Sequence, residues 1–232
     1  MTGTVDREVG TAVLEQIMDE RWTCRQFRPE PVPRADIDRL LRLAQRTPSW
    51  CNTQPWHTVV TEGEGTARLR QALLDQVDSG GAISSDIAWP PGYEGVYQER
   101  RRECGMALYE TLGITREDKL GKAMQMRRNF EFFDAPHVAI ITTTESLGAY
   151  GAVDCGLYIG TFLLAAQSLG LGAAPQAALA SYSELLHREL DIPADRHVVA
   201  GISFGYADAD APVNTFRTTR ADLADAVTFV SD

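Results

Sequence analysis

Residues 138–172 read VAIITTTESLGAYGAVDCGLYIGTFLLAAQSLGLG and carry the strongest structural signal in the chain. Residues 138–143 form a nearly continuous β-branched run, which predicts a buried strand. Residues 149–169 are small or apolar nearly all round a helix, which predicts a central buried helix. Gly170 and Gly172 follow it and are expected to end it. This stretch therefore predicts a buried strand followed by a buried helix.

The flanking sequence adds further helices and strands of ordinary length. No internal repeat, low-complexity tract or Gly/Ser linker divides the chain, so we expect one α+β domain over residues 1–232. The first helix should be capped by Thr4 or Asp6 and end near Glu20, because both capping residues can accept from free backbone N–H groups. The other predicted helices cover residues 36–44, 64–78, 97–112, 115–130 (capped by Thr115) and 181–189, and the other strands cover residues 56–61, 198–206 and 226–230.

Composition limits the partners and the compartment. The chain is 44% hydrophobic with a net charge of −10, so its average field repels nucleic acid and anionic membranes. No stretch approaches the roughly 18 uninterrupted apolar residues of a membrane span, and no signal peptide is recognisable. Four cysteines lie far apart at positions 24, 51, 104 and 155. We therefore expect a cytoplasmic protein with reduced thiols, the alternative being one regulatory disulfide.

The sequence offers little for chemistry carried by side chains. It has no metal-ligand cluster, nucleophile elbow or Walker loop, and its four histidines are scattered. Gly170-Leu171-Gly172 follows a helix, whereas the glycines of a dinucleotide-binding fold open one. Asp154 lies inside the apolar helix, where pairing with a nearby backbone group or arginine is the favoured interpretation. An enzyme of this composition would rely on a cofactor for the difficult step.

Four segments point to such a cofactor. They are Arg21-x-Thr23-x-Arg25, the loop Pro48-Ser-Trp-Cys-Asn-Thr-Gln-Pro-Trp56, the turn Leu169–Gln176, and Asn214-x-x-Arg217-x-x-Arg220. In this order the segments resemble the FMN-dependent nitroreductase family over nearly the whole chain. Thr23 replaces the family's usual serine, which keeps a hydroxyl. Residues 79–131 match less well, which leaves the substrate open.

The resemblance implies a mixed, mostly antiparallel sheet wrapped by helices in an intertwined homodimer, with two FMN sites at the interface. It implies that NAD(P)H supplies electrons to FMN, which then reduces nitroaromatic or related small acceptors by a ping-pong mechanism. No catalytic side chain or metal is then required. The alternatives are enone or quinone reduction, reductive dehalogenation, flavin breakdown, or a flavin-binding protein without turnover.

The resemblance also assigns residues to parts of FMN. Arg21, Arg217 and Arg220 would bind the phosphate, because an arginine fork suits its two charges. Thr23 would hydrogen-bond the phosphate or the ribityl chain. Arg25 would lie at the pyrimidine edge of the ring, where a cation favours the reduced flavin. The alternative for each arginine is an ordinary surface ion pair, and for Thr23 a turn that ends the first helix.

Two further groups of residues complete the implied site. The loop containing Pro48, Ser49, Asn52 and Gln54 would contact the FMN of the partner subunit, although it also suits a plain turn. Backbone N–H groups in the segment Pro175, Gln176, Ala177 would pass the ring edge near N5 and O4, so the Gln176 side chain is expected to tolerate substitution. Asn129 would make a polar flavin contact. The arginine runs 100–102 and 127–128 are most simply solvated helix faces, the alternative being a patch for the phosphate of the nicotinamide cofactor.

Overall fold

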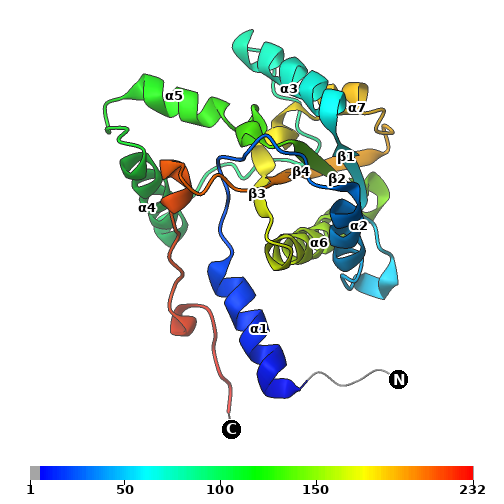
Figure 1. Cartoon of the computed structure of the whole chain (residues 1–232), viewed down its shortest axis with the longest axis vertical. Helices are drawn as coiled ribbons and strands as arrows, with labels where there is room; N and C mark the ends of the chain where they lie inside the picture. The colour runs from blue at the N-terminus through cyan, green and yellow to red at the C-terminus, as the bar shows by residue number, and fades with distance from the viewer. Residues whose placement is uncertain (1–5, 232) are drawn as a thin grey trace.

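The computed structural model describes residues 6–231, and a four-stranded sheet forms its centre (Figure 1). The strands are β1 (His57–Thr61), β2 (His137–Thr144), β3 (Gly172–Gln176) and β4 (Arg196–Gly205). Their order is β1-β2-β4-β3, and every neighbouring pair is antiparallel. This confirms the predicted α+β fold with a mostly antiparallel sheet, and it places β3 at an edge.

Helices cover both faces of the sheet, as Figure 1 shows. One face carries α2 (Arg34–Ala44) and α6 (Gly148–Ser168), and the other carries α3 (Gly63–Asp78) and α7 (Ser183–Glu189). The alternation of the pleat explains the continuous apolar run of β2. Ala139 and Ile141 pack with α6, whereas Val138 and Ile140 face the opposite core. Both faces of the strand are therefore buried, as its sequence predicted.

Three helices lie outside these layers, and none has a buried residue: α1 (Arg7–Glu20), α4 (Gly95–Thr111) and α5 (Lys119–Arg127). Asp6 caps α1, its carboxylate accepting from the N–H groups of Glu8 and Val9. The other candidate cap, Thr4, lies outside the described residues. The predicted start of α5 at Thr115 is wrong, because Asp118 is the cap and accepts from Gly121 N at 2.8 Å.

The helix α6 ends as predicted but is not buried all round. Gly170 takes a left-handed φ of 71°, and Leu171 N donates back to Ala166 O at 2.9 Å. By length and composition alone residues 145–168 would suit a membrane span, a test that core helices also pass. One side of α6 packs on the sheet through Tyr158 and Phe162. The other side exposes an apolar surface formed by Tyr150, Val153 and Leu157.

Two segments differ in secondary structure from the sequence prediction. Residues 172–176 were expected to be a turn, yet they form β3, with Pro175 on the edge strand where a missing N–H is tolerated. Residues 226–230, predicted as a final strand, pair with no strand within residues 6–231 of this chain. Phe229 and Val230 are 86% and 91% exposed. A strand requires a neighbouring edge, and none of the described residues provides one there, so the final strand stays a prediction for an assembled dimer.

Candidate functional site: a cleft lined by arginines

A cleft of about 400 Å³ lies between the end of α1 and the C-terminal segment. We call it the arginine cleft; it is lined by Met18, Asp19, Arg21, Trp22, Thr23, Arg25, Phe216, Arg217, Thr218 and Arg220. The five phosphate and ring residues expected from the opening and closing motifs are thus brought together. The two motifs lie nearly 200 positions apart, so only the folded chain makes them one site.

Backbone pairing fixes the opening motif against the sheet. Thr23 forms a parallel bridge with Ala173 of β3, and Cys24 N donates to Ala173 O at 3.1 Å. Gly172 permits this approach, since a Cβ there would lie 3.0 Å from Cys24 Sγ. The two glycines of the Leu169–Gln176 segment therefore have different roles: Gly170 ends α6, and Gly172 lets residues 23–24 lie against β3.

A buried amide joins the opening motif to the closing one. Asn214 Oδ1 accepts from Arg25 N at 2.8 Å, and Asn214 Nδ2 donates to Gln26 O at 2.8 Å and Asp208 O at 2.7 Å. All the hydrogen bonds cross between segments or close a turn, so Asn214 sets the distance between Arg25 and the tail that carries Arg217. Asn214 belongs to the closing motif, but the pattern of that motif does not predict this role.

The four arginines are not neutralised by carboxylates. None of them forms an ion pair within residues 6–231. Burial and the nearby charge of Arg220 lower the pKa of Arg21 below its ordinary value. Burial also lowers the pKa of Arg25, whose Nη1 donates only to Thr23 O, at 3.3 Å. Guanidinium groups that repel one another in a half-buried cleft favour an anionic ligand.

Aromatic rings support two of these guanidinium groups. Arg217 lies 4.4 Å from the Trp22 ring centroid and donates to Asn214 O at 2.7 Å, while Arg25 lies 5.6 Å from the Phe216 ring. Stacking of this kind holds a guanidinium plane without neutralising its charge. In addition, Trp22 Nε1 is buried and has no hydrogen-bond partner among residues 6–231. The cleft therefore has an unused donor as well as unneutralised cations, which fits a ligand with phosphate and hydroxyl oxygens.

The end of β3 is joined to the residue predicted as a polar flavin contact. Gln176 Nε2 donates to Asn129 O at 2.8 Å and to its Oδ1 at 3.3 Å, while Gln176 Oε1 accepts from Ser203 Oγ. Gln176 is buried. The expectation that its side chain tolerates substitution is therefore wrong for the fold, because replacing it leaves buried polar groups without partners. Pro175 and Ala177 flank it at the same end of β3.

The predicted Pro48–Gln54 loop lies away from the arginine cleft. In Figure 1 the segment after α2 is on the opposite side of α6 from α4 and the C-terminal tail. Ser49, Asn52 and Gln54 therefore do not line the arginine cleft of their own chain. Their polar groups are used within the loop instead, as Ser49 Oγ accepts from Gln54 N at 2.9 Å and Gln54 Nε2 donates to Asn52 Oδ1 at 3.2 Å.

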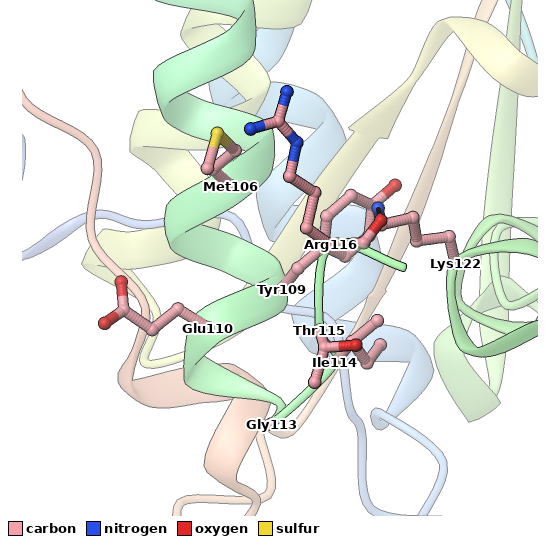
Figure 2. A pocket seen from close by; sticks show the side chains of 8 residues that line it. All are labelled: Met106, Tyr109, Glu110, Gly113, Ile114, Thr115, Arg116 and Lys122. Carbon is pink, nitrogen blue, oxygen red and sulfur yellow. Dashed lines mark hydrogen bonds between the residues drawn. The ribbon is translucent and has the colours of Figure 1, made fainter. Parts of the chain in front are cut away.

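A second cavity, of about 480 Å³, lies between α4 and α5 (Figure 2). Met106 and Tyr109 form its α4 wall, and Lys122 reaches over the Tyr109 ring at 5.5 Å while donating to Arg116 O. Glu110 points away from Lys122 in this view. The cavity falls within residues 79–131, the part of the chain that matches the family motifs less well.

The remaining candidates take structural roles. Arg127 and Arg128 form ion pairs, with Asp78 and Glu131 and with Glu131 and Asp134, so this arginine run joins α5 to its neighbours. The four cysteines are unpaired. Asp154 is buried on α6 and accepts from the Trp50 backbone N–H, which confirms the expectation that it pairs with a nearby backbone group.

Known proteins resemble this chain over most of its length. The model of the nitroreductase family matches residues 18–206. Nitroreductase NfnB of Mycolicibacterium smegmatis is 36% identical, covering 93% of this chain and 92% of its own length. A 4-nitrobenzoate reductase of Nocardioides is also 36% identical, covering 100% of this chain and 99% of its own. The crystal structure of the FMN-dependent nitroreductase NfnB from Mycobacterium smegmatis in complex with NADPH superposes with a TM-score of 0.91, at 35% identity over 95% of this chain and 99% of that one.

Proposed function

The chain belongs to the nitroreductase family, and on this basis we propose that it is an FMN-dependent oxidoreductase that reduces nitroaromatic compounds with electrons from NAD(P)H. Relatives that span almost the whole chain are described as nitroreductases and a 4-nitrobenzoate reductase, and the similar crystal structure contains NADPH. We infer that the chain is a single domain built on one sheet and that it acts in the cytoplasm, an inference that the unpaired cysteines support.

The observation that carries this proposal is the set of unneutralised guanidinium groups in the arginine cleft. A flavin phosphate brings about two negative charges, and arginine forks bind phosphate oxygens in pairs. We assign Arg21, Arg217 and Arg220 to the phosphate, with the Thr23 hydroxyl beside them. The distance between the motifs is held by the buried Asn214, so the phosphate site is assembled before the ligand arrives.

The other side of the site suits the flavin ring. We assign Arg25 to the pyrimidine edge and the backbone of Pro175, Gln176 and Ala177 to the edge near N5, with Asn129 held close by Gln176. Bound FMN supplies the hydride and electron transfer between the nicotinamide and the nitro group. The side chains of this chain then have to bind, orient and stabilise charge, and no nucleophile or general base is required.

We propose that the working form is a homodimer with its FMN sites at the interface. The exposed apolar side chains of α6 lie beside α1, which exposes Val9, Val13 and Leu14. Patches of this kind mark interaction surfaces. The Pro48–Gln54 loop lies away from the arginine cleft of its own chain, so a second copy is needed to bring Ser49, Asn52 and Gln54 to a flavin. Obligate interfaces of this type bury roughly 2,000–5,000 Å².

The test starts with the purified protein. We expect it to be yellow, to release about one FMN per chain on denaturation, and to oxidise NADPH or NADH steadily only when a nitroaromatic acceptor is added. A colourless protein that takes up no added FMN would contradict the proposal. A flavin-loaded protein that oxidises no nicotinamide with any acceptor would identify a flavin-binding protein instead.

A further inference from the structure

The Pro48–Gln54 loop together with Pro55, called the 48–55 loop below, has a backbone conformation that its sequence does not favour. Cys51, Asn52 and Gln54 have φ values of 51°, 54° and 47°, all in the left-handed region that non-glycine residues seldom adopt. Asparagine tolerates this region, but cysteine and glutamine do not share that preference. Such residues persist where their surroundings hold them, and they gather at ligand sites. The groups that hold this loop are therefore of functional interest.

A buried carboxylate holds the first half of the loop. Asp154 is 5% exposed, and its two carboxylate oxygens accept from Trp50 N at 3.2 and 3.3 Å. Asp154 forms no ion pair within the described residues. A buried carboxylate without a cation is costly to maintain, so its single backbone contact must be favourable.

A guanidinium group holds the other end of the loop. Arg196 on β4 donates from Nη2 to Pro55 O at 3.0 Å and to Thr142 O at 2.9 Å, and from Nε to Thr142 Oγ1 at 2.7 Å. Its fork thus joins the end of the loop to β2. The Asp154 carboxylate thus attaches the loop to helix α6, and the Arg196 guanidinium attaches it to the sheet. The two side chains form no ion pair with each other.

The attached loop presents one amide to the outside. Gln45 Nε2 donates to Gln54 Oε1 at 3.0 Å, and Gln54 Nε2 donates to Asn52 Oδ1 at 3.2 Å, which orients the Asn52 side chain. Asn52 is exposed, and no group within residues 6–231 accepts from its Nδ2. The strained loop therefore carries an oriented donor that is free to bind a ligand.

We propose that Asp154 and Arg196 are positioning residues, which hold the 48–55 loop so that the Asn52 amide is preset for FMN bound to the partner subunit. This inference rests on the proposed function. Without the two attachments the loop would relax toward ordinary backbone angles, and FMN binding would have to restore the strained form. Preorganisation of this kind acts through binding affinity more than through the chemical step.

The first test compares two neighbouring alanine variants of α6. Asp154→Ala removes the acceptor of the Trp50 N–H, whereas Cys155→Ala removes a buried side chain whose hydrogen bond goes to Thr142 O on β2. We expect Asp154→Ala to raise the FMN Kd at least about 10-fold, the effect of losing one charge-assisted hydrogen bond. Asp154→Asn keeps an acceptor oxygen and should change the Kd less than about 3-fold. Cys155→Ala should lower the melting temperature while leaving the Kd within about 2-fold.

A second pair of variants avoids any change in the core. Trp50 is 61% exposed, and Ser49 before it already has the extended backbone that a following proline requires. Trp50→Ala removes only the ring, whereas Trp50→Pro also removes the N–H that Asp154 accepts. We expect Trp50→Pro to weaken FMN binding at least about 10-fold relative to Trp50→Ala. Equal Kd values for this pair would overturn the proposal.

Hydrogen exchange of the loop amides separates this inference from the proposed function. In the wild-type protein the Trp50 amide should exchange slowly, and Asp154→Ala should make it exchange fast while the β2 amides stay protected. A wild-type protein that binds no FMN would contradict the proposed function. Unchanged exchange of the Trp50 amide in Asp154→Ala would contradict the attachment, and fast exchange with an unchanged FMN Kd would contradict its role in binding.

Discussion

Replacing Arg25 by alanine tests the electrostatic role of the arginine cleft most directly. The Arg25 guanidinium is half-buried, stacks on Phe216 and donates only to Thr23 O. No carboxylate within the described residues neutralises it. Its charge therefore acts on the bound ligand. Reduction places negative charge on the pyrimidine side of a flavin, so a cation there binds the reduced ring more strongly than the oxidised one.

The contacts of Arg25 set the size of the effect. A hydrogen bond to a charged group contributes about 1.5–3 kcal/mol, and Arg25 loses little of this to competing protein acceptors, because its one acceptor is a carbonyl at 3.3 Å. For a two-electron couple about 1.4 kcal/mol corresponds to about 30 mV. If the contact acts mainly on the reduced state, Arg25→Ala should lower the potential by roughly 30–65 mV.

The assay combines a redox titration with stopped-flow reduction by NADPH. Arg25→Ala should slow flavin reduction, and added FMN should not restore the rate. Arg25→Lys keeps the charge and should recover part of the potential. Arg21→Ala is the matched control, because its loss should raise the FMN Kd roughly 10- to 150-fold, with activity returning in excess FMN. An unchanged potential in Arg25→Ala would show that Arg25 does not lie at the pyrimidine edge.

Three further predictions concern stability and assembly. Burial lowers the pKa of His187, but hydrogen bonds to the Ile192 carbonyl oxygen and the Asp86 carboxylate raise it overall above its ordinary value. The contact therefore stabilises the fold fully below the unfolded pKa of about 6.5, and this stabilisation is lost as the pH rises through the folded pKa. Asp86→Asn should accordingly lower the melting temperature more at about pH 6 than at about pH 9. Gly201→Ala should destabilise the protein by about 1–3 kcal/mol in denaturant titrations, because the added Cβ clashes with Leu179 Cδ1; an unchanged midpoint would mean that this core yields. Ending the chain after Arg220 removes exposed apolar side chains of the tail and should shift sedimentation toward monomer, whereas an intact FMN-loaded dimer would exclude the tail from the interface.

Local sequence was enough to predict the elements whose signals are local. The strand β2 and the helix α6 were predicted within a residue or two, since a β-branched run and a glycine stop act over a few neighbouring residues. Asp6 was expected to cap α1 for the same reason. The motif residues Arg21, Thr23, Arg25, Arg217 and Arg220 were predicted to form one site, and the structure brings them to one cleft. Their individual contacts with FMN stay predictions.

Contacts between distant segments were beyond the reach of local patterns. Residues 172–176 contain weak strand formers and become β3 through pairing with β4 and contact with Cys24, neither of which lies nearby in the sequence. The 226–230 segment has strand-like residues but joins no edge within residues 6–231, so only an assembled dimer can test that strand. Gln176 was expected to tolerate substitution, whereas its buried amide bonds with Ser203 and Asn129.

The same limit applies to the 48–55 loop. Its sequence predicts a polar turn with amides suited to a flavin, and the contacts of these amides with FMN stay a prediction. The left-handed angles, however, depend on Asp154 and Arg196, which follow the loop by about 100 and 140 positions. The hydrogen bonds of these two charged side chains to the loop form only when helix and sheet have packed, because they are strengthened by the exclusion of water. The sequence therefore determines which side chains are available, whereas the distances between them and their burial, which set their chemistry, depend on the packed chain.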